Sequence, residues 1–343
     1  MVVIGIDAHK KTHTAVAVDE AGRRLGSVTV PATSEGHLKL VRWAARFEQC
    51  RWAVEDCRHV TVRLERDLLA VGQCVSRVPP ALTARTRKMV RAAGKSDEID
   101  ALAVARAALA NPDLPIAVLD GPSRQLRQLV DHREQMVGHR TAMQNRVRWF
   151  LHELDPEYQP GSLSSLAGAD RVLAWLADGR HDPHTASLCA ELVTLIRQAT
   201  VRINQLKSEI TRRVKKIARF LLDLRGVGPL TAAKLIGEIG NITRFKSRDA
   251  FAMWAGSAPI PASSGNQNVY RLNRGGNRQV NAALHRIAVT QARDYPPAQA
   301  IIARHSGDGR TKKHAYRVLK RRLANVIYTT LVQHQQHTQT RAA

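Results

Sequence analysis

The chain opens with Val2-Val3-Ile4-Gly5-Ile6-Asp7, an apolar run that ends in a carboxylate and predicts a buried first strand. A second run with the same ending is Trp52-Ala53-Val54-Glu55. Lys95-Ser96-Asp97-Glu98-Ile99-Asp100 then sets two aspartates three residues apart ahead of a helical stretch, and residues so spaced share a helix face. Because hard divalent cations prefer several oxygen ligands, the pattern predicts a site for two Mg²⁺ ions, with Mn²⁺ as the other candidate. The predicted ligands are Asp7, Glu55, Asp97 and Asp100.

Short apolar and alternating segments predict the elements around these acids. Strands are expected at 2–7, 13–19, 25–30, 51–55 and 73–78. Helices are expected at about 34–47, 60–70, 81–90 and 96–110. Ser34 and Ser96 are of a residue type that caps helix N-termini, and both stand where a helix is expected to begin. The order β-β-β-α-β-α-β-α-α predicts an α/β domain over 1–115 with a mixed sheet flanked by helices.

The middle of the chain has helical patterning. Apolar residues recur near heptad spacing from 123 to 151 and, more regularly, from 186 to 220. A linker rich in Gly, Asp and Pro, about 154–185, joins the two series. The pattern predicts a helical hairpin with coiled-coil packing over 122–220. An intramolecular coiled coil and a helix exposed for dimerisation fit the pattern equally well.

The region 221–335 is expected to be an all-α domain that begins with a Gly-Val-Gly turn between two helices. Helix-hairpin-helix elements use such a turn to bring backbone N–H groups and a helix N-terminus close to a phosphate. An ordinary tight connection between helices is the other interpretation. The candidate DNA-binding residues here are Arg225, Gly226, Val227, Gly228 and Lys234.

Charge favours a nucleic-acid partner. The formal net charge is +24, and residues 226–343 alone hold 18 Lys and Arg against 4 Asp and Glu. Such an excess is typical of a protein that binds a phosphate backbone, although a solvated basic surface is the simpler alternative. No apolar run approaches 18 residues and no signal peptide is evident, so no membrane partner is expected. The four cysteines show no zinc spacing, and a cytoplasmic, nucleoid-associated location is expected.

A loop rich in Ser, Gly, Pro and Asn is expected over 256–277. It contains Ser263 and Ser264, and a serine beside a glycine in a loop can be exposed as a nucleophile. No histidine stands at a recognisable spacing to act as base, so the residues alone favour a flexible linker. Three guanidinium groups that suit phosphate clamping lie at Arg271, Arg274 and Arg278.

Several motifs stand in one order along the chain: Gly5-Ile6-Asp7-Ala8-His9-Lys10, Glu55, Lys95-Ser96-Asp97-Glu98-Ile99-Asp100-Ala101, Gly226-Val227-Gly228-Pro229 and Gly256-x-x-Pro259-x-x-x-Ser263-Ser264-Gly265. In this order the chain resembles, over nearly its whole length, the DEDD transposases or recombinases of circle-forming insertion sequences. The resemblance implies an RNase H-like (RuvC-like) N-terminal domain in which the first and fourth strands are neighbours. One departure is the segment 266–270, which lacks the basic residues commonly found there.

The resemblance also carries functional expectations. The four acids are implied to bind the metals, and a loop serine is implied to attack DNA and become covalently joined to it. Ser263 matches the family pattern better, and Ser264 is the alternative. An RNA from the same element is implied to pair with donor and target DNA, a division of labour seen in other RNA-guided systems. A homo-oligomer, dimer or tetramer, is expected.

The predicted function is therefore a DNA transposase or recombinase that cuts and rejoins strands. The rival enzyme is a Holliday-junction-type, structure-selective endonuclease that uses water, which needs the acids but not the serine. The rival from another class is a non-catalytic nucleic-acid-binding protein in which the acidic cluster is structural.

Overall fold

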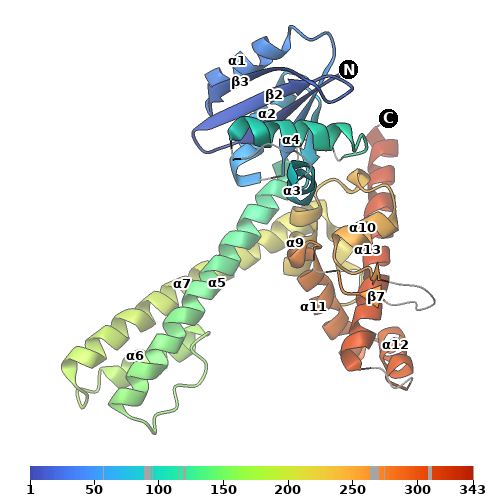
Figure 1. Ribbon diagram of the computed structural model, residues 1–343. Coiled ribbons are helices and arrows are strands. Elements are labelled where there is room, and N and C mark those ends of the chain that lie inside the picture. Colours follow the sequence, from blue (N-terminus) through green and yellow to red (C-terminus); the bar gives the residue numbers. More distant parts are fainter. Residues whose placement is uncertain are drawn as a thin grey trace. The chain divides into compact units, whose positions relative to one another are not determined.

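The computed structural model describes residues 1–56, 58–88, 94, 96–114, 116–118, 121–262, 270–273, 275–307 and 311–342. The chain, drawn in Figure 1, divides into two compact units. The first unit is Met1–Leu119 with Thr243–Phe245, and the second is Asp120–Ile242 with Lys246–Ala343. A boundary inside the second unit, between domains at 122–220 and 221–335, remains a prediction.

In its described residues, the first unit is built on a five-stranded mixed sheet in the order β3-β2-β1-β4-β5. The strands are β1 (Val2–Ala8), β2 (Thr12–Val18), β3 (Arg24–Pro31), β4 (Cys50–Glu55) and β5 (Val75–Val78). β1 runs antiparallel to β2 and parallel to β4, and β4 runs parallel to β5. The prediction that the first and fourth strands are neighbours is confirmed, and the sheet is of the mixed kind expected for an RNase H-like domain.

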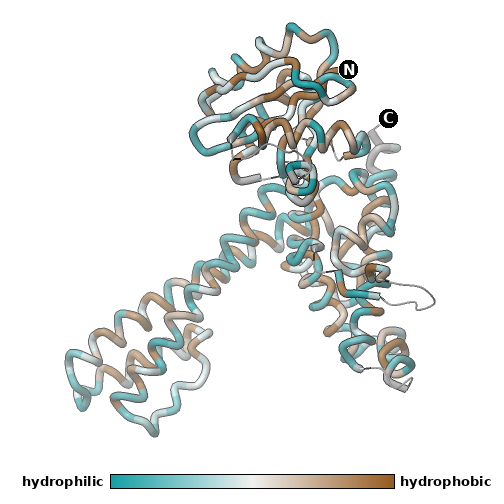
Figure 2. Tube along the Cα trace, viewed as in Figure 1, coloured by the Kyte–Doolittle hydropathy of each residue, from teal (hydrophilic) through white to brown (hydrophobic). Residues whose placement is uncertain are grey.

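Helices cover both faces of the sheet. They are α1 (Ser34–Ala44), α2 (Arg58–Ala70), α3 (Pro80–Lys88) and α4 (Asp97–Leu109). Side chains alternate between the faces of a strand, so Ile4 and Ile6 pack with Leu40 of α1 and Leu68 of α2. Val3 points to the opposite face, which α4 covers. The central strands are accordingly hydrophobic in Figure 2.

Two helix starts were expected to have serine caps, and one does. The Ser96 hydroxyl accepts a hydrogen bond from the Ile99 N–H at 3.3 Å, so Ser96 caps α4 as predicted. The cap of α1 is instead Thr33, whose hydroxyl accepts from the Gly36 N–H at 3.1 Å. Thr33 has the extended backbone that an N-cap adopts, whereas Ser34 is already the first helical residue.

The second unit begins with two long helices, α5 (Gly121–Leu154) and α7 (Pro183–Ile217), which pack side by side (Figure 1). The segment between them is not only a linker, because it contains α6 (Leu166–Leu176). Ala169, Val172 and Leu176 are spaced as one helix face and join the core shared by α5 and α7. Coiled-coil packing itself remains a prediction.

The rest of the second unit is mostly helical. Its helices are α8 (Arg219–Leu222), α9 (Pro229–Ile239), α10 (Arg248–Trp254), α11 (Arg278–Asp294), α12 (Pro296–Gly307) and α13 (Lys312–Ala342). The 3₁₀ turn η1 (Ile242–Arg244) begins in this unit and ends in the short segment assigned to the first. The all-α expectation is wrong in one place, because β6 (Ile260–Pro261) pairs antiparallel with β7 (Tyr270–Arg271). Two extended segments of the Gly- and Pro-rich loop thus meet instead of leaving their backbone groups unpaired.

Candidate active site

Asp7 and Glu55 stand at the same edge of the sheet. β1 and β4 are parallel with Ile6 opposite Val54, so each acid follows the last residue of this paired register. The residues just before them, Ile6 and Val54, pack under α1 and α2. Because successive side chains of a strand point to opposite faces, Asp7 and Glu55 point to the face that α4 covers. They line one pocket of about 730 Å³. A parallel register and a shared pleat therefore bring together two acids that are distant along the chain.

Helix α4 brings the aspartate pair to this edge. A Cβ atom at Gly5 would lie 2.3 Å from the Ala101 carbonyl oxygen and 2.3 Å from the Ala105 nitrogen, so the helix backbone rests directly on β1. From Ala101 back to Asp97 is one turn, roughly 6 Å of helix. From Gly5 forward to Asp7 is two strand residues, about 6.6 Å. The matching steps set Asp97 level with Asp7.

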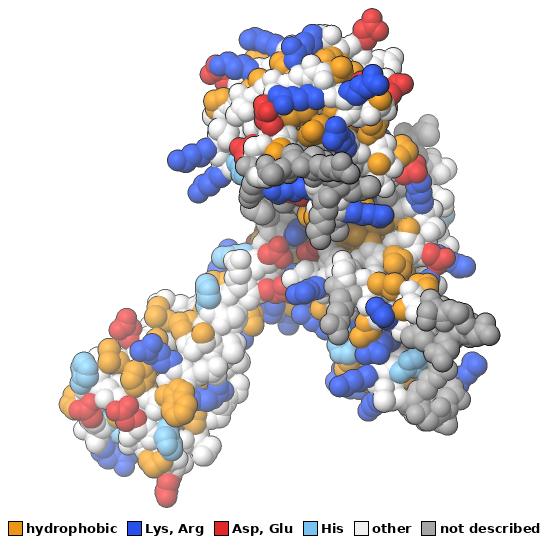
Figure 3. Space-filling view, in the orientation of Figure 1, with side chains coloured by type: hydrophobic (Ala, Val, Ile, Leu, Met, Phe, Trp, Pro, Cys, Tyr) orange, Lys and Arg blue, Asp and Glu red, His pale blue; other side chains and the backbone are white. Residues whose placement is uncertain are grey.

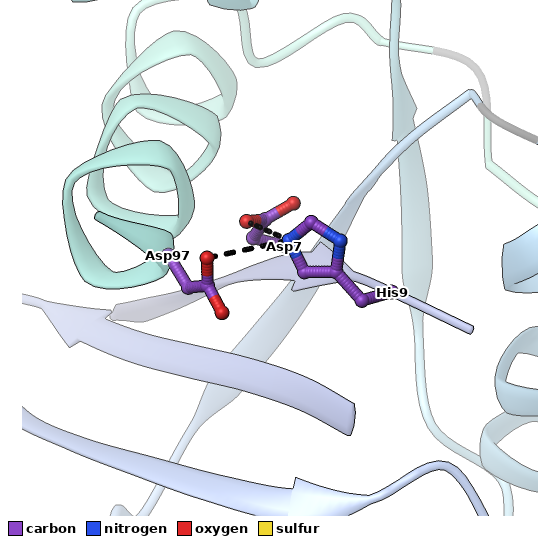
Figure 4. Close-up of side chains that lie close together, drawn as sticks. All are labelled: Asp7, His9 and Asp97. Atoms are coloured by element: carbon purple, nitrogen blue, oxygen red, sulfur yellow. Dashed lines mark hydrogen bonds and ion pairs between the residues drawn. The ribbon is translucent and has the colours of Figure 1, made fainter. Parts of the chain in front are cut away.

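The side-chain atoms at this edge are close enough together to bind one cation (Figure 4). His9 Nε2 lies 3.0 Å from Asp7 Oδ2 and 3.4 Å from Asp97 Oδ1. One ligand atom from each of these three residues lies within 4.8 Å of the other two. His9 therefore lies between Asp7 and Asp97 and contacts both carboxylates.

Asp100 approaches from the pocket side. It lines the same pocket as Asp7 and Glu55, and its Oδ1 pairs with Arg87 Nη1 at 2.8 Å. The neighbouring acid Glu98 is directed away from the pocket, where its carboxylate meets Arg24 Nη1 at 2.9 Å. The helix turn therefore selects Asp97 and Asp100 over Glu98, as the sequence predicts.

Among the described residues, Asp7 lies close to other carboxylates. Burial raises the pKa of Asp7 above its ordinary value, and the carboxylates of Asp100 and Asp97 raise it further. The interaction with His9 lowers the pKa of Asp7 but does not cancel the effect of burial. A bound cation would relieve both the repulsion and the cost of burial. Carboxylate oxygens are the donors that Mg²⁺ and Mn²⁺ prefer, so this set fits a divalent cation.

Three residues of this site have no role in the sequence prediction. His9 had a detectable signal, because it follows Asp7 by two residues and so continues the same strand face. Gly5 was visible only as a glycine inside a strand, which indicates a close approach by another backbone. Arg87 had no signal, because nothing in the pattern tells which basic residue of α3 meets the pocket.

The turn predicted to meet phosphate is partly occupied by contacts within the protein. Arg225 Nη2 pairs with Asp294 Oδ2 at 2.6 Å, and both side chains are half-exposed. Gly226 has φ +80°, a conformation that favours glycine. Val227 is buried, and Gly228 is the N-cap of α9 without a side-chain cap. Because α8 before the turn has only four residues, a complete helix-hairpin-helix remains a prediction.

The structure contradicts the prediction that Lys234 binds DNA, because this residue is buried. Only 2% of its side chain is exposed, and its Nζ lies 3.0 Å from Asp131 Oδ1 and 2.7 Å from Glu134 Oε2 of α5. A buried ammonium needs such partners, so Lys234 joins α9 to α5 and does not face a nucleic acid. The sequence around the turn is basic and gives no sign of this pairing, because the two acids that pair with Lys234 stand 103 and 100 residues earlier.

The candidate serines, Ser263 and Ser264, lie outside the described residues, as does Arg274. Arg271 of β7 and Arg278, the first residue of α11, are both exposed.

The loop expected over 256–277, here called the serine loop, has closely packed residues at its two ends. A Cβ atom at Gly276 would lie 2.3 Å from Gly256 Cα. Asn281 Nδ2 donates to the carbonyl oxygens of Ala255 and Gly256, at 3.0 and 2.8 Å, and its Oδ1 accepts from Lys320 Nζ at 2.8 Å. The two ends of the loop are therefore held against α11 and α13.

None of the helices in the described parts of the chain has both the length and the apolar character that crossing a bilayer requires.

Part of the chain has a structural likeness to "T. thermophilus RuvC in complex with Holliday junction substrate". The likeness covers 33% of this chain and 95% of the RuvC chain, with 17% sequence identity and a TM-score of 0.26.

Sequence relatives extend over nearly the whole chain. The chain is 28% identical to an uncharacterised protein of insertion element IS116 from Streptomyces clavuligerus, over 96% of this chain and 94% of that protein. It is 25% identical to an uncharacterised protein of insertion element IS900 from Mycobacterium paratuberculosis, over 96% and 95%. A family model described as a transposase matches residues 4–156, and another, described as the transposase IS116/IS110/IS902 family, matches residues 218–303. The chain therefore belongs to the IS116/IS110/IS902 family of insertion-element transposases.

Proposed function

We propose that this transposase cuts and rejoins DNA strands by transesterification, with divalent cations held by Asp7, Glu55, Asp97 and Asp100. The observation that supports the proposal is that Asp7, Glu55 and Asp100, from β1, β4 and α4, line one pocket, while Asp97 of α4 has a carboxylate oxygen within 4.8 Å of one of Asp7. Family membership gives the class of substrate, and the donor set gives the class of cation. Arg87 adds a guanidinium to the pocket wall, where a phosphodiester would meet it.

The proposed chemistry separates the roles of the acids and of the serine. Cations bound at the pocket would polarise the scissile phosphate and stabilise the leaving oxygen. The Ser263 Oγ, or that of Ser264, gives up its proton and forms a bond to phosphorus, while the bond from phosphorus to the DNA 3′ oxygen breaks and that oxygen takes up a proton. The products are a phosphoserine and a free 3′ hydroxyl. Attack by a new 3′ hydroxyl reverses the step and joins the strands. The serine assignment rests on the family resemblance.

The proposal includes nucleic-acid partners and assembly. The charge of residues 226–343 supports binding of donor and target DNA through their phosphates. A guide RNA from the same element, and a homo-oligomer that is a dimer or a tetramer, are included on the family resemblance alone. Purifying the chain from cells and sequencing the nucleic acid that accompanies it would identify such an RNA.

Single substitutions test the chemistry. Asp7→Asn, Glu55→Gln, Asp97→Asn and Asp100→Asn should each lower strand cleavage roughly 100-fold or more, the usual scale for removing one electrostatic group from an active site. Glu98→Gln is the matched control, because this acid sits between two of the ligands but faces away from the pocket. Cleavage of labelled DNA with Mg²⁺ measures the loss, and thermal unfolding checks that each variant folds. Wild-type rates in an acid variant would remove that residue from the site.

Trapping the covalent product distinguishes the proposed transposase from its rivals. Ser263→Ala, alone and with Ser264→Ala, should retain nucleic-acid binding and yield no DNA-linked protein on a denaturing gel. Cleavage without any covalent species in the wild-type protein would favour the endonuclease that uses water. An absence of divalent-metal dependence in every assay would favour a non-catalytic binding protein.

A further inference from the structure

His9 is a polar residue of the pocket to which the proposed reaction gives no role. It stands directly after β1, where its backbone N–H donates to the Thr12 carbonyl oxygen at 2.9 Å and so fixes the turn into β2. The ring lies over the pocket edge between two carboxylates, and about half of the side chain is exposed. This hydrogen-bonded turn thus presents one imidazole nitrogen to Asp7 and Asp97.

The separations between the donor atoms match those around a single ion. Two ligands at about 2.1 Å from an octahedral ion, at right angles to each other, are about 3.0 Å apart. The distances from His9 Nε2 to the nearer oxygens of Asp7 and Asp97 are 3.0 and 3.4 Å. A cation that bound both carboxylates from this side would therefore also meet Nε2, with only small adjustments of the side chains.

We infer that His9 is a nitrogen ligand of the cation bound by Asp7 and Asp97, and that it makes this position prefer a first-row transition metal to Mg²⁺. This inference refines the cation site of the proposed function. Mg²⁺ is served best by oxygen donors and water, whereas an imidazole nitrogen adds affinity for transition metals. Mn²⁺ is the suitable probe, because it accepts both kinds of donor and also suits the carboxylates.

A competing interpretation predicts the opposite change in metal affinity when the His9 ring is removed. In it, His9 only donates hydrogen bonds to the two carboxylates and occupies the place of the cation, so that the ring must leave before a metal binds. Removal of the ring would then tighten metal binding. If His9 is a ligand, its removal weakens binding of Mn²⁺ more than binding of Mg²⁺. The direction of the change in His9→Ala therefore separates the two interpretations.

The experiment measures metal binding without DNA. The full chain is stripped of metal and titrated with Mn²⁺ or Mg²⁺ by calorimetry, with the paramagnetic resonance signal of free Mn²⁺ as a second readout. His9→Ala should weaken Mn²⁺ binding at least roughly ten-fold, since even residues that only support a ligand are worth that much. His9→Asp, which supplies an oxygen donor instead, should shift the preference toward Mg²⁺. His139→Ala, at an exposed histidine of α5 in the other unit, is the matched control.

Each outcome of the titration is decisive. Unchanged or tighter Mn²⁺ binding in a folded His9→Ala protein overturns the inference, as does an equal loss for both metals. A wild-type chain that binds neither metal also overturns it. A protein that binds Mn²⁺ through His9 but neither cuts nor joins DNA would contradict the proposed function and leave this inference standing.

Discussion

His13 shows how one buried residue couples the first unit to pH. It lies on β2 with 2% of its side chain exposed, and its ring stacks on His37 at 5.2 Å between centroids. Burial, reinforced by the nearby His37, lowers the pKa of His13 from 6.5 to about 4. The folded chain therefore binds this proton less readily than the unfolded chain, and protonation opposes folding.

The expected result is a loss of stability in acid. The contribution of His13 is fully present above pH 6.5, the unfolded value, and is lost as pH falls toward about 4. A shift of this size corresponds to about 3 kcal/mol. Denaturant unfolding of the wild type and of His13→Gln, at pH 7 and pH 4.5, measures the contribution. If both proteins lose the same free energy of unfolding between these pH values, His13 is not the group responsible.

Lys234 shows where single residues escape prediction. Its neighbours along the chain are consistent with a basic surface, yet its ammonium is buried against two carboxylates of α5. Charge along the chain does not specify which face of α9 turns inward, because that depends on a helix 100 residues away in sequence. The positions of Asp97 and Asp100 were predictable, because Ser96 fixes where α4 begins and the helical repeat then fixes which acids share a face.

At the scale of elements, the packing of α4 on β1 sets the geometry of the pocket. Gly5 lacks the side chain that would separate the strand from the helix, and small buried residues such as Ala101 and Ala105 line the facing side of α4. A Cβ atom at Gly5 would meet backbone atoms, which cannot rotate away. The close approach is therefore a property of the whole helix–strand pair.

Gly5→Ala should displace α4 and destabilise the first unit by about 1–3 kcal/mol, the usual cost of overpacking. It should also weaken metal binding, because Asp97 and Asp100 move with the helix while Asp7 stays with the strand. Gly138→Ala is the control, since its added Cβ meets nothing within 4 Å and lies in the middle of α5. That change should stabilise the protein by roughly 0.5–1 kcal/mol. Unfolding and Mn²⁺ titration of both variants provide the measurements.

Most of the elements followed from local patterns, and the exceptions have physical causes. The five strands were expected from their apolar and alternating runs, and the adjacency of the first and fourth was implied by the family resemblance, as β1 and β4 show. Helix α6 was missed because Gly, Asp and Pro at the ends of its segment resemble a linker, although Ala169, Val172 and Leu176 form a helical face. The contact of β6 with β7 was missed because two-residue strands carry no periodic signal.

At the scale of the molecule, positive charge is concentrated late in the chain. Residues 1–110 hold 18 Lys and Arg against 12 Asp and Glu, whereas residues 226–343 hold 18 against 4. Lys and Arg side chains are visible on both units in Figure 3. Some cations of the first unit pair with acids, as Arg24 and Lys39 do, while the last third has few acids to offer. Unpaired surface charge attracts phosphates over the range of the Debye length.

Binding of nucleic acid by the full chain should therefore weaken steeply with salt. Each phosphate contact that is lost should lower the slope of log affinity against log salt by about 0.9 for duplex DNA. Arg271→Gln and Arg278→Gln each remove one exposed guanidinium beside the serine loop and should each lower the slope by about that amount. Lys39→Gln is the control, because this lysine is exposed on α1 and pairs with Glu35. Fluorescence anisotropy with a labelled duplex at several salt concentrations gives the slopes. Equal slopes in all four proteins would mean that these arginines do not contact phosphate, and that the cationic third of the chain binds through other residues.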